Sequence, residues 1–304
     1  MPSAKEIKDR ISSVRDTQKI TNAMYLIAST KMRKAKADLD RTMPYFSALR
    51  GEIKRIFRTV GNIDSQYFFP EGSQEDLPGA CGYLVITADK GLAGAYNQNA
   101  IREAQRLMDQ HDDNKLFVVG EYGRQYFSSR GVPIEQSFLY TAQNPTLQRS
   151  RDICYQLLDR YRAGELVKIF VVYTDFSGLA STARSVRLLP FHHAHFASAS
   201  SEKRVKVPFG FSPSVETVLD SIIPSYVTGF IYSALVDSFC SEQNERMKAM
   251  DAAGKNAQEL LDDLTIQSNH MRQGAITQEL TEISAGVLGQ RRRQERQTEG
   301  GNML

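Results

Sequence analysis

Apolar and small residues recur every three or four positions along the last third of the chain, from Ser214 to about Leu288. This spacing places them in one stripe along a helix, so the pattern predicts a single long helix. At 1.5 Å per residue, such a helix would be roughly 110 Å long. No compact domain buries a rod of that length. It therefore needs a second long element beside it, or a partner protein around it.

The first 60 residues carry the same kind of pattern. Apolar or small positions run from Ile7 to Val60 in steps of threes and fours, which is typical of a coiled-coil seam or a long packed helix. Ser3 and Glu6 have the spacing of a capping box that starts the helix. Gly61 is expected to end it. Pro44 lies inside the pattern and is expected to kink or interrupt the helix.

These two long helices lie at opposite ends of the chain, with an insert between them. If they pair, the insert joins the end of the first to the start of the second, so they run antiparallel. The second is longer, and its C-terminal end should project beyond the first. A lone projecting helix is marginal in water. Its last turns are still apolar, which predicts a socket in another chain. Pro224 is expected to kink or divide this helix near its start.

The middle of the chain alternates strand and helix patterns after a polar loop at residues 62–80. Alternation of this kind predicts a small α/β domain with a mainly parallel, Rossmann-like sheet. The expected strands are 83–87, 116–119, 134–139, 167–173 and 183–189, and the expected helices are 97–111, 123–129 and 146–162.

The predicted fold class is therefore α/β plus a long antiparallel α-helical coiled coil, with the small sheet domain inserted between the paired terminal helices. The expected boundaries are 1–61 for the N-terminal coiled-coil helix, 62–211 for the α/β domain and 212–288 for the C-terminal helix. Residues 289–304 are charged and contain Gly300 and Gly301, so a disordered tail is expected there.

Composition narrows the class of protein further. No run of 18 or more apolar residues occurs, and the first 20 residues are charged throughout, so neither a spanning helix nor a cleaved leader is expected. Cys81, Cys154 and Cys240 are far apart and match no metal or disulfide spacing. They are interpreted as small buried apolar groups in a reducing compartment.

The net charge of +3 conceals an asymmetry. Residues 1–60 contain 14 Lys and Arg against 6 Asp and Glu, which favours an acidic partner. The densest basic cluster, Lys31 to Lys36, spreads around its helix. It is either a solvated face or a contact with an acidic protein surface. Nucleic acid is not indicated, because the cluster has no interleaved aromatic residues and the chain has no nucleic-acid motif.

Two segments resemble small-molecule sites. Residues 89–94 (DKGLAG) follow the first strand, with Glu121 after the second, but both the dinucleotide fingerprint and the phosphate-binding loop pattern are missing. A structural tight turn is the preferred interpretation. His192, His193 and His195 form either a loop or an adventitious metal site. No hydrolase elbow or metalloprotease motif occurs, so no catalytic residue, cofactor or resident metal is expected.

Three separate motifs, in order, resemble the gamma subunit of F-type ATP synthase of the bacterial type. They are residues 7–35 (IKDRISSV, TQKITNAM and ASTKMRKA), residues 85–97 (VITADKGLAGAYN), and the C-terminal helix with Arg246-Met247 and residues 272–283 (RQGAITQELTEI). Order and spacing agree along nearly the whole chain.

This resemblance implies a non-catalytic rotary shaft. The coiled coil is expected inside a ring of alternating alpha and beta subunits, and the sheet domain beside the epsilon subunit on the membrane c-ring. Turning the asymmetric shaft is expected to change the affinities of the beta sites in sequence, coupling ion flow to ATP synthesis or hydrolysis. The implied location is the cytoplasmic side of a bacterial cell membrane, as a peripheral part of the complex.

The resemblance also assigns contact roles to single residues. Met24, Lys31 and Arg246 are expected near the acidic levers of the beta subunits, although Met24 also fits the helix seam. Residues expected in the bearing inside the ring are Arg272, Gln273, Thr277, Gln278 and Glu282. The alternatives are a coiled-coil adaptor with an α/β head and no catalytic ring, and a nucleotide-dependent enzyme that uses the head.

Overall fold

The structure, a computed structural model, describes residues 3–60, 65–69, 77–176, 181–191, 210–212 and 214–300, with side chains described for all of these except 57–60 and 291–300. The chain divides into two compact units. The first comprises residues 1–24 and 250–304, and the second comprises residues 25–249. The predicted polar loop and the three clustered histidines lie largely or wholly outside the described residues.

Two long helices begin and end the described chain. Helix α1 spans Ala4–Val60 and α6 spans Val215–Gly300. The predicted capping box is present, because Ser3 N donates to Glu6 Oε2 at 2.8 Å and Glu6 N donates to Ser3 Oγ at 3.2 Å. Among the stripe positions of α1, Ile7, Ala28, Phe46, Ile53 and Ile56 are buried. The periodicity therefore identified the packed face correctly.

Neither proline divides its helix, so the expected interruption is wrong at both positions. Pro44 lies within α1 and Pro224 within α6. Around Pro224 the helix is held by packing, since Ile223 and Val227 are fully buried on the head. Thr228 Oγ1 also donates to Pro224 O at 2.8 Å. Tertiary packing on both sides of the proline offsets the missing backbone hydrogen bond.

The end of α6 also differs from the sequence expectation. The helix runs to Gly300, whereas a disordered tail was expected from residue 289. Residues 290–297 consist mainly of Arg, Gln and Glu, which are good helix formers, so charge alone was a poor guide to disorder.

The two helices run antiparallel in each unit. In the second unit Phe46 meets Gly229, and Cys240 Sγ lies 3.9 Å from Met32 O. In the first unit Gln18 Nε2 donates to Gln258 Oε1 at 3.0 Å. Higher numbers on α6 thus face lower numbers on α1, as the insert between them requires.

The insert forms a five-stranded sheet in the order β3-β2-β1-β4-β5. Strands β1 to β4 are parallel and β5 is antiparallel to β4, so the predicted mainly parallel α/β domain is confirmed. The elements are β1 Cys81–Ile86, α2 Tyr96–Met108, β2 Asn114–Val119, α3 Glu121–Ser129, β3 Ile134–Phe138, α4 Leu147–Arg162, β4 Lys168–Phe176 and β5 Ser181–Leu189.

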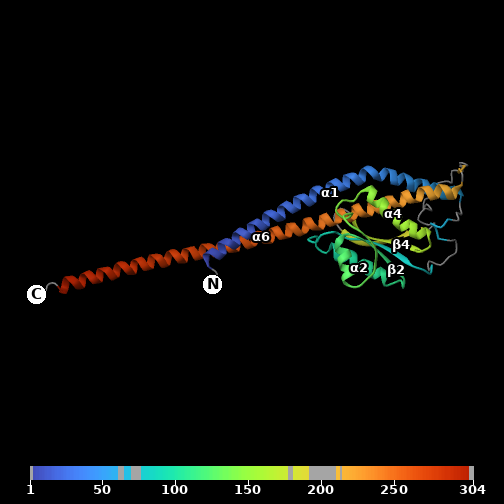
Figure 1. Cartoon of the computed structure of the whole chain (residues 1–304). Helices are drawn as coiled ribbons and strands as arrows, with labels where there is room; N and C mark the ends of the chain where they lie inside the picture. The colour runs from blue at the N-terminus through green and yellow to red at the C-terminus, as the bar shows by residue number, and fades with distance from the viewer. Residues whose placement is uncertain are drawn as a thin grey trace. The chain divides into compact units, whose positions relative to one another are not determined.

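Alternate residues of the central strands enter two cores, one on each face of the sheet. Tyr83 and Val85 pack with α2 and α3, whereas Leu84 and Ile86 pack with α4, the end of α1 and the start of α6. Figure 1 shows α2 on one side of the sheet and α4 and α6 on the other. On α6 the face committed to this core comprises Leu219, Ile223, Val227, Ile231, Ala234 and Leu235.

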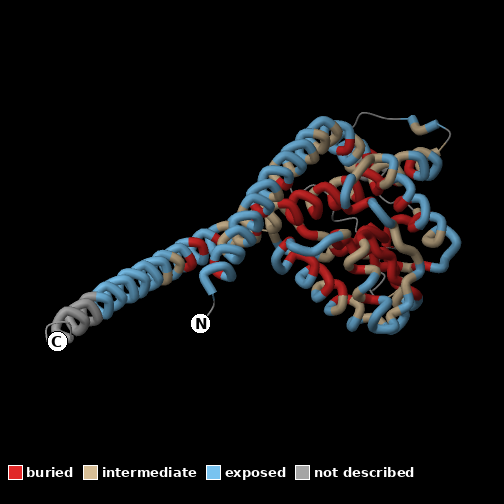
Figure 2. Tube along the Cα trace, turned by 60° about the vertical axis from the view of Figure 1, so that its left-hand side comes forward, coloured by how far each residue is buried: buried red, intermediate tan, exposed pale blue. Residues whose placement is uncertain are grey.

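Burial changes sharply along α6. Figure 2 shows buried residues concentrated in the head and in the part of α6 that crosses it, and a largely exposed C-terminal part. Residues 272–290 are all exposed. A window of α6 is apolar enough by length and composition to cross a membrane, but half of it is buried inside the protein. The core helix of a globular protein has the same composition, and the sheet accounts for the buried half.

A close approach of α1 and α6 depends on Gly229. A Cβ added there would lie 2.1 Å from Phe46 Cδ1. We therefore expect Gly229→Ala to push the helices apart and lower the free energy of unfolding by about 1–3 kcal/mol. Urea denaturation of the full chain measures this.

Gly274→Ala is the matched control, because it lies on the same helix with nothing within 4 Å of the added atom. This substitution should raise the free energy of unfolding by about 0.5–1 kcal/mol, because Ala has a higher helix propensity than Gly. Equal effects of the two substitutions would contradict the close approach.

Candidate functional site

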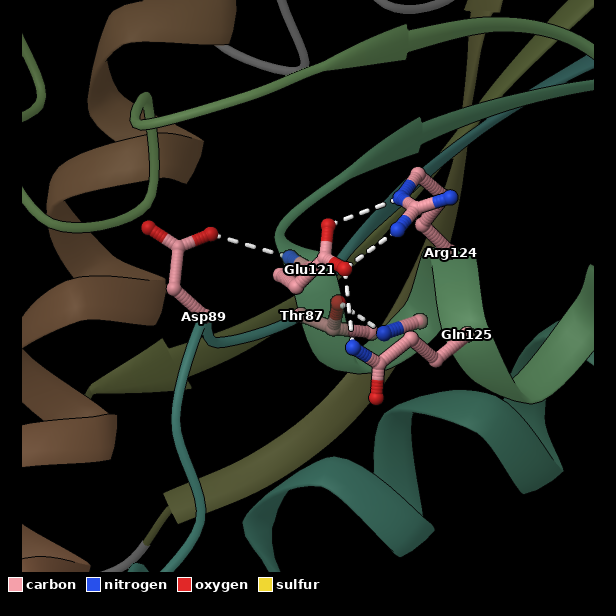
Figure 3. A network of polar contacts seen from close by, with 6 residues as sticks. Thr87, Asp89, Glu121, Arg124 and Gln125 are labelled. Atoms are coloured by element: carbon pink, nitrogen blue, oxygen red, sulfur yellow. Dashed lines mark hydrogen bonds and ion pairs between the residues drawn. The ribbon is translucent and has the colours of Figure 1, made fainter.

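The turn between β1 and α2 is a structural turn built on polar contacts with the next strand. Thr87 Oγ1 donates to Val119 O at 2.8 Å and accepts from Gly123 N at 3.0 Å. Asp89 Oδ1 accepts from Glu121 N at 2.9 Å, at the start of α3 (Figure 3). Gly120 has a φ of 96°, and a Cβ there would lie 2.3 Å from Thr87 O. Glycine is thus required where the ends of β1 and β2 meet.

Glu121 has no free carboxylate to offer a ribose. Its oxygens accept hydrogen bonds from Arg124 and Gln125 of its own helix, as Figure 3 shows. These hydrogen bonds lower the pKa of Glu121 to about 2. The structure therefore supports the tight-turn interpretation of residues 89–94 over a nucleotide site.

The place where a doubly wound sheet ordinarily binds its ligand lies between β1 and β4, beyond their carboxyl ends, where the strand order reverses. In this protein α6 occupies that place. Thr174 N donates to Ser238 Oγ at 3.1 Å, and Ser241 Oγ donates to Thr174 O at 3.3 Å. Both serines are buried, and Tyr96 is buried beside them. We call Tyr96, Thr174, Ser238 and Ser241 the switch-point socket.

The socket completes the backbone pairing of β4. The ladder between β1 and β4 ends at Val85 and Val172, whereas β4 continues to Phe176. Thr174 thus lies beyond the last β1 partner, and its peptide groups bond the serines of α6 instead. These serines were not predicted from the sequence, because small residues at helical spacing carry no distinctive signal. The only signal was their position on a helix face that is otherwise apolar.

Directly after the socket on α6 begins a charged cluster, formed by Lys31, Asp89, Glu242 and Arg246. Arg246 Nη1 bonds Glu242 Oε1 at 2.6 Å, and Arg246 Nη2 donates to Gly91 O at 3.1 Å. Burial raises the pKa of Glu242, while Arg246 and Lys31 act against that rise. The cluster thus ties the β1–α2 turn to the long helix.

The residues expected to contact partners fall into three environments. Arg246 is largely buried in its pair with Glu242, with only 12% of its side chain exposed. Met24 is half-buried on the seam of α1, and Lys31 is exposed beside a cavity of about 200 Å³. The five bearing residues are all exposed on α6: Arg272, Gln273, Thr277, Gln278 and Glu282.

The exposed end of α6 is apolar as well as polar. Ile276, Leu280, Ile283, Val287 and Leu288 are each about half exposed or more. Such an exposed apolar surface is typical of a protein contact. Among the described residues, no three His, Cys, Asp or Glu side chains gather into a group that could hold a metal ion. The arrangement suits mechanical contact between proteins.

Comparison with known proteins defines the class. Residues 3–288 match the family model described as ATP synthase, so the chain belongs to the ATP synthase family. Within that family it resembles the gamma chain, the non-catalytic subunit of the central stalk.

Two curated relatives named ATP synthase gamma chain illustrate the match. That of Caldanaerobacter subterraneus is 41% identical and covers 93% of this chain and 98% of its own. That of Ruminiclostridium cellulolyticum is 37% identical, and the match covers 93% of this chain and 97% of the relative. The expected family is therefore confirmed, and an adaptor or enzyme unrelated to ATP synthase is not supported.

Solved structures agree with the fold. A chain of the central stalk and c-ring of the Tetrahymena thermophila mitochondrial ATP synthase is 25% identical, with a TM-score of 0.58 over 77% of this chain and 99% of that one. A rotor chain of the Euglena gracilis mitochondrial ATP synthase is 13% identical, with a TM-score of 0.61. The match covers 90% of this chain and 98% of that one. The second match concerns the fold alone.

A half-buried carboxylate near the socket, that of Asp237, predicts a pH dependence. Burial, with Asp175 of β4 nearby, raises the pKa of Asp237 to about 6, while Ser233 of α6 and Lys36 of α1 act against the rise. Arg184 of β5 pairs with Asp175 at 3.3 Å. Because the folded pKa is raised, the stability present below the ordinary pKa of Asp is lost as pH rises through about 6.

Asp237→Asn should therefore raise the free energy of unfolding at pH 8 by about 1–3 kcal/mol and change it little at pH 4. Urea denaturation at both pH values measures this. Asp159→Asn, on an exposed position of α4, is the control and should show no such difference. An Asn variant whose gain is the same at both pH values would show that Asp237 does not titrate as described.

Proposed function

We propose that this chain is the rotating central shaft of a bacterial F-type ATP synthase. It couples ion-driven rotation of the membrane c-ring to ATP synthesis or hydrolysis at beta subunits. The exposed, apolar C-terminal part of α6 is the observation that supports this most directly. A helix that is buried in a sheet core at one end and exposed at the other suits a part anchored in a head and inserted into a partner.

The partners follow from the family and from charge. The alpha and beta subunits surround the helix pair, and the head stands beside the epsilon subunit on the c-ring. The surplus of positive charge on α1 favours acidic levers on the beta subunits. Met24 and Lys31 are proposed lever contacts. Arg246 contributes there chiefly by holding the β1–α2 turn, because its guanidinium is already paired with Glu242.

The bearing is proposed at the exposed end of α6. Gln278 Nε2 donates to Glu282 Oε1 at 3.0 Å, and Thr277 Oγ1 donates to Gln273 O at 2.8 Å. These internal bonds satisfy part of the polar surface and leave an apolar stripe between them. Together with Arg272, these residues form the proposed contact with the inner surface of the ring. The complex is placed at the cell membrane, with this chain on its cytoplasmic side.

Rotation couples to affinity because the shaft is asymmetric. Each beta site meets a different face of the shaft at any one moment. A ligand shifts an equilibrium only as far as it binds two conformers unequally. The shaft acts as such a ligand for the conformers of each beta site, so its rotation changes the affinities of the sites in turn.

Reconstitution tests the function directly. The full chain is mixed with alpha and beta subunits of a gamma-chain relative's complex, followed by gel filtration and ATP hydrolysis with and without the chain. Co-migration and hydrolysis that depends on the chain are expected. A chain that elutes alone and leaves hydrolysis unchanged would contradict the proposal.

The bearing can be tested with one pair of variants. Ile276→Lys combined with Leu280→Lys places two charges on the exposed apolar stripe, so the melting temperature of the free chain should not change. Assembly with the ring should weaken by about tenfold or more, since charges at an interface core are costly when unpaired.

Asn269→Lys is the control, because it adds a charge at an exposed polar position of the same helix. It should assemble like the parent chain. Equal assembly of the stripe variant and the control would count against a bearing at this stripe.

A further inference from the structure

The apolar contact between α6 and the sheet does not by itself fix how α6 is turned about its axis. Leu219, Ile223, Val227 and Ile231 resist separation of helix and sheet, because separation exposes their surface. Hydrophobic contact is non-directional, however, so it favours burial of this face without specifying which polar groups of helix and sheet meet. Directional contacts are needed to select one register.

The switch-point socket supplies such contacts. Ser238 and Ser241 lie three residues apart on α6 and therefore share one face. One accepts from the peptide N–H of Thr174, and the other donates to the carbonyl of the same residue. Two hydrogen bonds to a single residue of the interior strand β4 restrict both the position of α6 along its axis and its rotation about that axis.

Burial makes a change of register costly. The exposed fraction of Ser238 is 1% and that of Ser241 is 0%. If α6 slid or turned, the peptide groups of Thr174 would lose their partners in the interior, where an unpaired polar group costs about 1–3 kcal/mol. These polar contacts thus add to the apolar packing in separating the parent register from its neighbours.

The position of the socket extends the argument to function. In doubly wound folds the switch point is where a ligand is held. We propose that the head uses this place to hold its own long helix, and that Ser238 and Ser241 are positioning residues that set the angular phase of α6 relative to the head. This inference rests on the proposed shaft function. The angle of α6 relative to the head matters only if the c-ring turns the head and α6 in turn acts on the beta subunits.

The test compares the parent chain with the double variant Ser238→Ala and Ser241→Ala. This change keeps the packing volume almost constant and removes both hydroxyl groups. The control is Thr265→Val, whose hydroxyl donates only to Leu261 O of its own helix. Spin labels at Lys248→Cys on α6 and Arg102→Cys on α2 report the position of α6 on the head, since both positions are exposed. The three native cysteines are buried and should label poorly.

The distance distribution between the labels is measured in the full chain by pulsed electron spin resonance. The parent and Thr265→Val should give one narrow distribution. The double variant should give a broadened or second distribution, because each lost hydrogen bond raises the population of other registers by about fivefold. Should the double variant be too unstable to label, each single serine variant carries the test with a smaller effect. An unchanged distribution in the labelled variant would overturn the positioning role.

The functional consequence is measured in the assembled, membrane-embedded complex as ions transported per ATP hydrolysed against an increasing ion gradient. Under load, the number of ions transported per ATP hydrolysed should be about twofold lower in the double variant than in the parent. Thr265→Val should keep the parent value. Broadened distances with full coupling under load would overturn the claim that coupling depends on the angular phase of α6. Failure of the parent chain itself to assemble would instead contradict the shaft function, and the distance measurement would still decide the register.

Discussion

The fold depends on one helix serving two cores. The early part of α6 packs its apolar face on the sheet with α4 and the end of α1, while later parts pair with α1 in each compact unit. One continuous helix, Val215–Gly300, supplies both contacts. Its buried apolar face attaches it directly to the sheet of the head, as a shaft requires.

Polar contacts refine this arrangement. Thr174 bonds the two serines of α6, and Arg246 bridges Glu242 and the carbonyl of Gly91. Both sets of contacts lie at the carboxyl edge of the sheet, where related folds hold ligands. A site that elsewhere serves chemistry is used here for attachment. This explains how a sheet of nucleotide-binding architecture is compatible with a non-catalytic subunit.

Much of the architecture could be predicted from the sequence. Apolar residues spaced three and four positions apart identified the packed face of α1, and continuous apolar runs identified the central strands. Each pattern follows from the geometry of its element. Periodicity states that a face is buried but not against what, so the docking of Leu219 and Ile223 on the sheet was not foreseen. Contacts between residues far apart in the sequence, such as Arg246 with Gly91, cannot be predicted from the local sequence pattern. The continuity of α6 through Pro224 depended on packing that no local rule contains.

Rotation itself is the central claim, and a single-molecule experiment tests it most directly. The complex is immobilised through its beta subunits, and a probe is attached to an exposed position of α2 on the head. On addition of ATP, the probe is expected to turn in one direction in regular steps, at a rate set by hydrolysis. A probe that stays fixed while the same complex hydrolyses ATP would contradict it.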